Sequence, residues 1–248
     1  NSNEKLIENF KNILVDLNAK IEILRADLSE ISEERYTVKA LKKSLIGQEE
    51  FYGKLLESKE GFPQGTKYVL ENPKLFPQVF GTVADMFHID EKYRDALEIG
   101  LGDLSHSLIT KDRTTALSIL QRANELKAGD LTIIPLKEAL ELKVRLKNPP
   151  QIQQSMKRAS DLIKTSKRFK PLADYILGNL FIVDNLELES DRLVGYNIVD
   201  LYGNYSGNDV ILKHKKHSPY GNLIGRQDKL DLITNEIKVL TKRETKLE

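Results

Sequence analysis

Residues 7–31 read IENFKNILVDLNAKIEILRADLSEI, with apolar side chains at alternating steps of three and four residues. This heptad repeat, with charged residues between its members, predicts a coiled-coil helix. Residues 3–46 contain neither Pro nor Gly, so the helix should cover this whole range, roughly 60 Å at about 1.5 Å per residue. A stripe this narrow cannot form a core alone and needs a partner helix. Its members are Ile7, Phe10, Leu14, Leu17, Ile21, Leu24, Leu28 and Ile31.

The C-terminal segment supplies a partner, because Leu230, Ile233, Ile237 and Leu240 repeat the same spacing after Gly225. We expect the two segments to pair antiparallel within one chain, in some register that brings these four residues near Ile21, Leu24, Leu28 and Ile31. They could form a helical hairpin that closes the middle of the chain. They could also be the stubs of a longer coiled coil, which fits better because the arms are unequal and neither ends in a stop signal.

The middle of the chain differs in composition and pattern. Gly and Pro are frequent from Gly61 to Gly81, and strand-like runs alternate with helical patterns. The predicted fold is mixed α+β: two small α/β subdomains inserted between the arms of an antiparallel coiled coil. The expected divisions are an arm and junction at 1–60, a first subdomain at 61–148, a linker and second subdomain at 149–222, and a returning arm at 223–248.

The helices and strands expected in the middle of the chain follow from residues that begin or end such elements. Asp90 and Asp112 should cap helices that end near Leu101 and Lys127, and Gly178 should end a third helix. The expected strands are 78–89 (single and bent, or a pair), 105–110, 131–135, 180–183, 197–201 and 209–213; the helices are 90–101, 112–127, 170–177 and one near 186–193; 137–170 is a helical bridge and 203–207 a turn.

Composition narrows the function classes. The chain has no cysteine, which excludes a disulfide scaffold, a thiol nucleophile and cysteine-ligated zinc. No run of about 18 apolar residues is present, so we expect no membrane span and no membrane partner. The chain starts at Asn1 without Met or a signal-peptide pattern, and is expected to be a piece of a cytoplasmic protein.

Motifs for catalysis are missing from the sequence. The nearest approach to a phosphate loop, Gly47 to Lys54, has the wrong glycine spacing, and Leu55 stands where a Ser or Thr should bind magnesium. Gly100 and Gly102 end a helix instead of opening one, so capping and packing are their expected roles. No nucleophile is paired with a base, and no histidine pair has metal-binding spacing. We therefore predict no catalytic residue, no cofactor site and no metal site.

Charge is unevenly distributed although Lys and Arg (38) nearly balance Asp and Glu (37). Residues 137–170 are strongly basic and residues 184–209 are acidic. The run Lys213–His217 (KHKKH) could hold phosphates electrostatically, or it could be a solvated loop. Nearby Tyr202, Tyr205 and Tyr220 could stack on unpaired bases or serve as turn and edge residues.

Several motifs resemble, in order and spacing, the hinge domain of structural maintenance of chromosomes (SMC) proteins. The resemblance covers roughly residues 61–230, with coiled coil on both sides. Its motifs are Phe80-Gly81-Thr82-Val83-Ala84-Asp85-Met86, Tyr93 with Ala96-Leu97-Glu98 and Gly100-Leu101-Gly102, Leu131-Thr132-Ile133-Ile134-Pro135-Leu136, Leu177-Gly178-Asn179-Leu180-Phe181-Ile182-Val183-Asp184, and Leu223-Ile224-Gly225-Arg226.

The chain departs from the family pattern near the end of the second subdomain. Asp200-Leu201-Tyr202-Gly203-Asn204 replaces the usual T-x-D-G-D, and Val210-Ile211-Leu212-Lys213-His214 lies where a glycine-rich segment would fall. In the family those glycines lie close to the dimer contact, where a missing side chain lets backbones approach. The dimer geometry is therefore the point at which this chain should differ.

The resemblance implies a non-enzymatic dimerisation hinge for chromosome segregation or condensation, associated with the bacterial nucleoid. The expected partners are a second SMC chain, as a homodimer, and DNA bound weakly without sequence preference. ATPase heads would lie elsewhere in the protein. The expected dimer residues are Val79, Phe80, Gly81, Thr82, Val83, Asp209, Val210, Ile211, Leu212 and Lys213; the expected DNA-binding residues are Lys213, Lys215, Lys216, Lys164, Lys167 and Arg168.

Two alternatives share the same arms. A ligand-binding α/β sensor inserted in a coiled coil should show a polar pocket with converging ligands, which the sequence does not reveal. A coiled-coil scaffold would differ from the hinge only in lacking DNA binding.

Overall fold

The structure is a computed structural model that describes residues 2–141, 156–186, 195–207, 210–214 and 222–248. It divides into two compact units, the first made of residues 1–53 with 230–248 and the second of residues 54–229. The sequence-based division into four parts is finer than this and stays a prediction.

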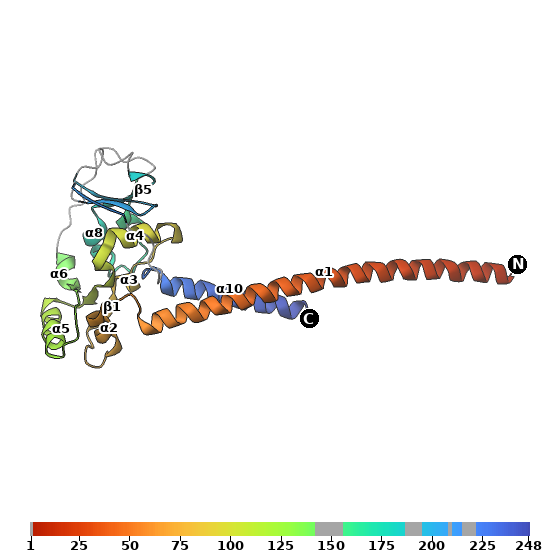
Figure 1. The fold of residues 1–248 in the computed structure, drawn as a ribbon, viewed down its shortest axis with the longest axis horizontal. Helices are drawn as coiled ribbons and strands as arrows, with labels where there is room; N and C mark the ends of the chain where they lie inside the picture. Colours follow the sequence, from red (N-terminus) through yellow and green to blue (C-terminus); the bar gives the residue numbers. More distant parts are fainter. Residues whose placement is uncertain (1, 142–155, 187–194, 208–209, 215–221) are drawn as a thin grey trace. The chain divides into compact units, whose positions relative to one another are not determined.

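The first unit is an antiparallel pair formed by helices α1 (Ser2–Ser58) and α10 (Arg226–Lys246) (Figure 1). The side-chain hydrogen bonds between the helices show that the two helices run antiparallel. Thr234 Oγ1 donates to Glu49 Oε1 at 2.6 Å, and Lys42 Nζ donates to Glu244 Oε2 at 2.7 Å. The pairing is within one chain, as the heptad patterns predicted.

The register corrects the sequence expectation. Val38, Leu45, Ile233 and Leu240 form the buried seam, with Tyr52, Ile237 and Leu247 packed against it. Leu230 is only half-buried and lies outside this cluster. The expected partners Ile21, Leu24, Leu28 and Ile31 are instead 43–67% exposed. The reason is length: Glu248, at the end of the chain, already lies beside Arg35, whose Nη2 is 3.3 Å from Glu248 Oε1.

The second unit contains two sheets. The first has the order β1 (Val79–Thr82), β2 (Leu108–Thr110), β3 (Ile133–Pro135); β1 and β2 are antiparallel, and β2 and β3 are parallel. Its helices are α2 (Gln64–Glu71), α3 (Val83–Met86), α4 (Arg94–Leu101), α5 (Arg113–Glu125) and α6 (Leu136–Glu141), with 3-10 turns η1 (Glu91–Tyr93) and η2 (Gly102–His106).

The expected strand over 78–89 is mostly wrong. Val79–Thr82 forms a strand, and His88 makes an isolated antiparallel bridge to Lys164, but helix α3 interrupts the range between them because Thr82 begins that helix through a reciprocal cap with Asp85. The Thr82 amide donates to Asp85 Oδ2 at 2.9 Å, and the Asp85 amide donates to Thr82 Oγ1 at 3.2 Å. Asp112 does cap α5 as predicted, with its carboxylate accepting from the Thr115 amide at 2.9 Å. Asp90 makes no side-chain cap to the turn that follows it.

The second sheet has the order β4 (Lys157–Arg158), β5 (Leu180–Val183), β6 (Asn197–Asp200), β7 (Asn204–Gly207), β8 (Ile211–His214). Only β5 and β6 are parallel. Helices α7 (Ala159–Leu162) and α8 (Lys170–Leu177) accompany it. The predicted turn at 203–207 is mostly strand β7. The predicted helix near 186–193 and much of the 137–170 bridge lie outside the described residues.

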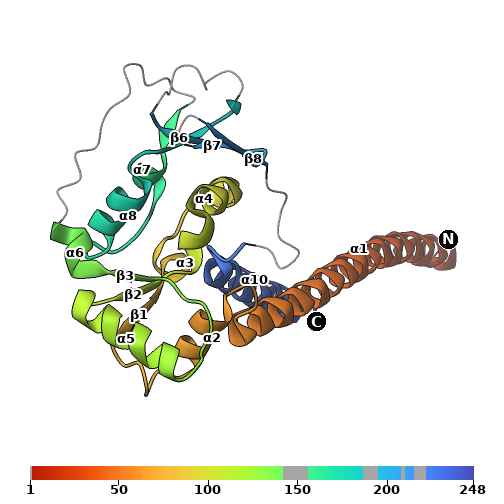
Figure 2. The ribbon, with the colours of Figure 1, turned by 60° about the vertical axis from the view of Figure 1, so that its left-hand side comes forward.

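One hydrophobic core joins the two sheets. It includes Phe87, Leu97 and Ile109 from the first subdomain, and Leu172 and Val199 from the second. Helix α4 lies between the sheets (Figure 2), and a Cβ at Gly100 would overlap the side chain of Leu180 on β5. Gly100 is thus needed for close packing, as the sequence indicated.

Candidate dimer and nucleic-acid interface

The first candidate surface is the outer edge of β1, which pairs only with β2 among the described strands. Gly81 has φ +131° at an irregularity in the β1–β2 register, a backbone shape that favours glycine. Phe80 is half-buried, its ring lies 6.4 Å from that of Phe169, and the Arg168 guanidinium stands 4.0 Å above it. Val79, Phe80 and Gly81 therefore present an ordered edge with a charged group fixed beside it.

Two of the expected dimer residues on this side are corrected. Thr82 and Val83 are fully buried within the chain, at 0% exposure. Thr82 is used as a helix cap, and Val83 lies in α3 inside the shared core. Their side chains contact the interior, so they have no surface to offer a second chain.

The second candidate surface is the outer edge of β8, which pairs only with β7 among the described strands. Val210 is 83% exposed, Ile211 41% and Leu212 78%. An open strand edge is a ready template for another strand, and natural proteins usually blunt such edges with charge or Pro. Here Val210 and the first two residues of β8 are apolar and exposed, and Lys213 and His214 follow them. Asp209, also expected at this contact, lies outside the described residues.

The basic residues occupy two separate elements. Lys213 is on β8, with its Nζ 5.5 Å from the ring centroid of Tyr205. Burial raises the pKa of the Tyr205 phenol, and this ring packs against the core, so its expected role in base stacking is not favoured. His214 Nδ1 lies 2.9 Å from Asn204 Oδ1. Lys215, Lys216 and His217 lie outside the described residues.

The other basic group, Lys164, Lys167 and Arg168, lies between α7 and α8. All three side chains are exposed. Lys164 Nζ donates to Asp90 Oδ1 at 2.6 Å, and this hydrogen bond lowers the pKa of the Asp90 carboxyl. Lys164 is therefore partly neutralised, whereas Lys167 has no ion pair with another described residue.

A polar junction at the start of α10 was not found from the sequence. The buried Glu98 carboxylate on α4 accepts from the amides of Leu223 and Ile224 at 2.7 and 3.4 Å. His88 Nδ1 lies 3.0 Å from Asp228 Oδ1. These partners are separated by more than 100 residues in sequence, so only the Leu223–Arg226 motif pointed to this region.

Gly225 and Arg226 explain that motif. Gly225 has φ +77° and packs against the Arg94 guanidinium, where a side chain would overlap it. Arg226 is buried and donates to the backbone oxygens of Glu60 and Asn222 at 2.6 and 2.9 Å. Together they fix the chain as it enters α10.

The described residues give no support for a catalytic or metal site. No group of three His, Asp or Glu side chains within the described part could hold a metal ion. Gly47 and Gly53 lie inside α1, where no phosphate loop can form. No helix in the described ranges combines the length and apolar character needed to cross a bilayer.

The arrangement of elements is that of SMC hinge domains. The structure superposes on the hinge domain of Geobacillus stearothermophilus SMC, described as an asymmetric dimer, with a TM-score of 0.72 over 90% of this chain and 92% of that one, at 16% sequence identity. The Pyrococcus furiosus SMC hinge domain gives a TM-score of 0.51 over 68% of this chain and 88% of that one, at 19% identity.

Sequence comparison agrees with the fold. Residues 76–188 match the family "SMC proteins Flexible Hinge Domain". The chromosome partition protein Smc of Halothermothrix orenii is 28% identical over 188 residues, 73% of this chain and 16% of that protein. That of Clostridium kluyveri is 27% identical over 252 residues, 97% of this chain and 20% of that protein. The chain is thus similar to SMC flexible hinge domains over residues 76–188, and it spans about a fifth or less of these relatives' length.

Proposed function

We propose that this chain is the non-enzymatic dimerisation hinge of a chromosome partition protein and that it pairs with a second copy of itself. The observation that carries the proposal is the exposed apolar edge of β8, Val210 to Leu212. Each chain offers this edge on one sheet and the β1 edge on the other. Pairing β1 of each chain with β8 of the other gives two equivalent contacts, which a two-fold axis closes.

The side chains at β8 define what kind of contact this is. A glycine-rich strand would let backbones approach closely, whereas Val210 and Leu212 add bulk at the edge. The dimer should therefore be held by apolar burial in addition to backbone hydrogen bonds, and it should resist salt. The proposed contact residues on this chain are Val79, Phe80 and Gly81 at β1, and Val210, Ile211, Leu212 and Lys213 at β8 and the turn before it; Asp209, also proposed, lies outside the described residues.

Sedimentation velocity on the 248-residue chain tests the dimer. Leu212→Glu places a charge in the apolar contact and should convert a dimer into a monomer at tens of micromolar chain. Leu117→Glu is the matched control, because Leu117 is 55% exposed on α5 and belongs to neither proposed strand edge, so it should leave the dimer intact. A wild-type chain that sediments as a monomer at this concentration would refute the proposal.

We also propose weak, sequence-independent DNA binding by the exposed basic residues. Lys167 is free of acidic partners among the described residues, and Arg168 is held in place by Phe80. Lys213, with Lys215 and Lys216 outside the described residues, would extend the positive surface along β8. Such binding should weaken steeply with salt, with a slope that reports the number of phosphates neutralised.

The DNA proposal is tested separately from the dimer. Replacing Lys215 and Lys216 by Glu, with Lys213 kept because it lies in the proposed dimer contact, should weaken binding to a short duplex in fluorescence anisotropy while the chain stays dimeric. Equal affinity of this variant and the wild type would reduce the basic run to a solvated loop. A salt-resistant dimer that does not bind DNA would favour the scaffold alternative. A monomer that a small ligand stabilises would favour the sensor alternative.

A further inference from the structure

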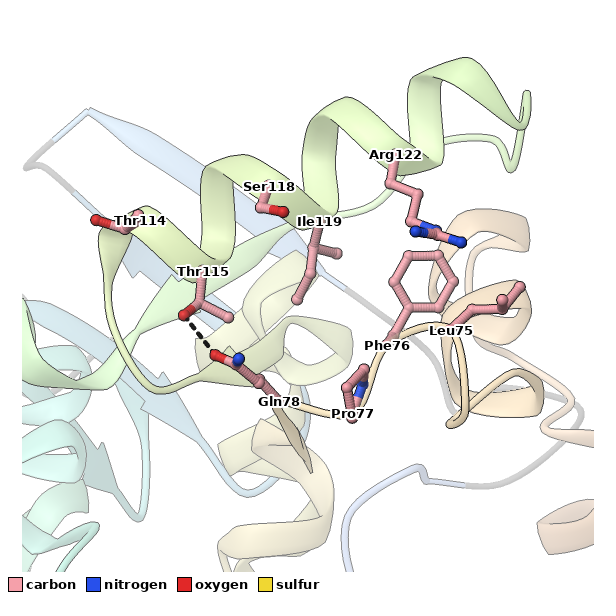
Figure 3. Close-up of a pocket in the computed structure, with 9 residues that line it drawn as sticks. All are labelled: Leu75, Phe76, Pro77, Gln78, Thr114, Thr115, Ser118, Ile119 and Arg122. Atoms are coloured by element: carbon pink, nitrogen blue, oxygen red, sulfur yellow. Dashed lines mark hydrogen bonds between the residues drawn. The ribbon is translucent and has the colours of Figure 1, made fainter.

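A groove beside α5 shares no lining residue with either candidate surface. It has a volume of about 310 Å³, at the lower end of ligand-binding pockets, and lies between α5 and the loop that leads into β1 (Figure 3). Its apolar side is Leu75, Phe76 and Pro77, and Ile119 adds an apolar side chain from the helix. Phe76 and Ile119 are 3% and 6% exposed and belong to the core, so the groove rests on a rigid base.

The helix side of the groove is polar and regularly spaced. Thr114, Ser118 and Arg122 follow one another at four-residue steps, so they lie along one ridge of α5 about 6 Å apart. None of these side chains makes a hydrogen bond or ion pair with another described residue. Thr115, in contrast, is already engaged, because its Oγ1 lies 2.8 Å from Gln78 Oε1 and 2.7 Å from Asp112 Oδ1.

Arg122 gives the groove a charged end. Figure 3 shows its guanidinium extending from α5 toward the ring of Phe76. The acidic residue one turn further along, Glu125, accepts instead from Gln121 Nε2 at 3.1 Å. A guanidinium without an acidic partner, beside apolar side chains, is complementary to a carboxylate carried on an apolar segment.

We propose that this groove binds a short extended peptide of a partner protein, in which apolar residues alternate with small polar ones and an acidic residue follows the last apolar one. Residues two apart in an extended chain are about 6.6 Å apart and face the same side, which matches the spacing of Thr114, Ser118 and Arg122. Hydroxyl groups both donate and accept, so Thr114 and Ser118 suit peptide or small polar groups. The acidic residue would pair with Arg122, and its apolar neighbours would contact Leu75 to Pro77.

Fluorescence anisotropy with a defined probe tests this inference, which does not depend on the dimer or DNA proposals. The probe is fluorescein-labelled Gly-Ser-Leu-Ser-Leu-Asp-Gly amide, and its control has Asn in place of Asp. We expect the 248-residue chain to bind the Asp peptide with a Kd on the order of 100 µM, since the contact is small. The Asn peptide should bind about tenfold more weakly because its charge-assisted hydrogen bonds are lost.

The variants locate the site. Arg122→Glu should weaken binding of the Asp peptide about tenfold or more and abolish or reverse the preference for the Asp peptide over the Asn peptide, because Glu repels the Asp carboxylate. Lys127→Glu makes the same charge change beyond the groove and should leave binding unchanged. Ser118→Phe should block binding by filling the groove, and circular dichroism confirms that each variant is folded. No binding at 1 mM peptide (about tenfold above the expected Kd), equal binding of both peptides, or equal effects of Arg122→Glu and Lys127→Glu would each overturn the proposal.

Discussion

Replacing Glu98 by alanine should release the chain segment that enters α10. The Glu98 carboxylate is 8% exposed and accepts from the amides of Leu223 at 2.7 Å and Ile224 at 3.4 Å. Those two residues are themselves 9% and 1% exposed. Alanine removes the acceptor without opening an easy path for water, so the amides lose their partner inside the protein.

The size of the effect follows from these contacts. The short bond to Leu223 has an ionised acceptor and contributes about 1.5–3 kcal/mol, whereas the longer bond to Ile224 adds little. With a buried amide left unsatisfied, Glu98→Ala should cost about 3 kcal/mol of local stability. Glu98→Gln keeps an oxygen acceptor but loses the charge, so it should cost about 1–2 kcal/mol.

Amide hydrogen exchange measures this directly. A loss of about 3 kcal/mol should speed exchange at Leu223 and Ile224 roughly a hundredfold. The control is Glu91→Gln in the same region, because the Glu91–Lys229 ion pair has side chains 69% and 31% exposed and should matter by no more than about 0.5 kcal/mol. Unchanged exchange in Glu98→Ala, or equal acceleration by both variants, would refute the reasoning.

Three further outcomes are expected. Ile233→Ala should destabilise the α1–α10 pair by about 2–4 kcal/mol in urea unfolding followed by circular dichroism, whereas Ile21→Ala, at a residue 44% exposed, should change it by no more than about 0.5 kcal/mol. The bond from Lys42 lowers the pKa of Glu244, so its stabilising effect is present above about pH 4.5 and is lost as pH falls through the lowered pKa; Lys42→Met should flatten this acid dependence of helicity. Gly81→Ala should lower the free energy of unfolding by about 1–3 kcal/mol, because φ +131° strains any residue with a Cβ, and the loss should appear as a lower thermal unfolding midpoint.

Local signals in the sequence were sufficient for several elements. The helix over Lys170–Leu177 and the strand over Leu180–Val183 were predicted with the bounds that the structure shows, because Gly178 ends the helix and the strand is an unbroken apolar run. The Asp112 cap was also readable from residue type and position. In each case the determining contacts lie within a few residues of chain.

Other features depend on contacts that periodicity cannot reveal. The repeat in residues 7–31 is cleaner than the one that follows it, yet the seam with α10 is made by Val38 and Leu45, because the length of α10 decides which part of α1 is covered. The sequence does not distinguish a buried Thr82 from one on an exposed strand edge, because an apolar run is compatible with both positions. The His88–Asp228 pair joins residues 140 positions apart, and nothing local marks it.

The single core shared by the two sheets has a consequence for how this protein folds. Its members extend along the chain from Val83 to Ile224, so much of the apolar burial requires contacts between distant residues. Such contacts form late and together, after long loops have closed, and they make folding slow but strongly cooperative. Each sheet also buries apolar side chains within its own subdomain, but the sheet faces that meet in this core are buried only against each other. A chain cut between α6 and β4 should therefore yield two fragments that fold only when mixed.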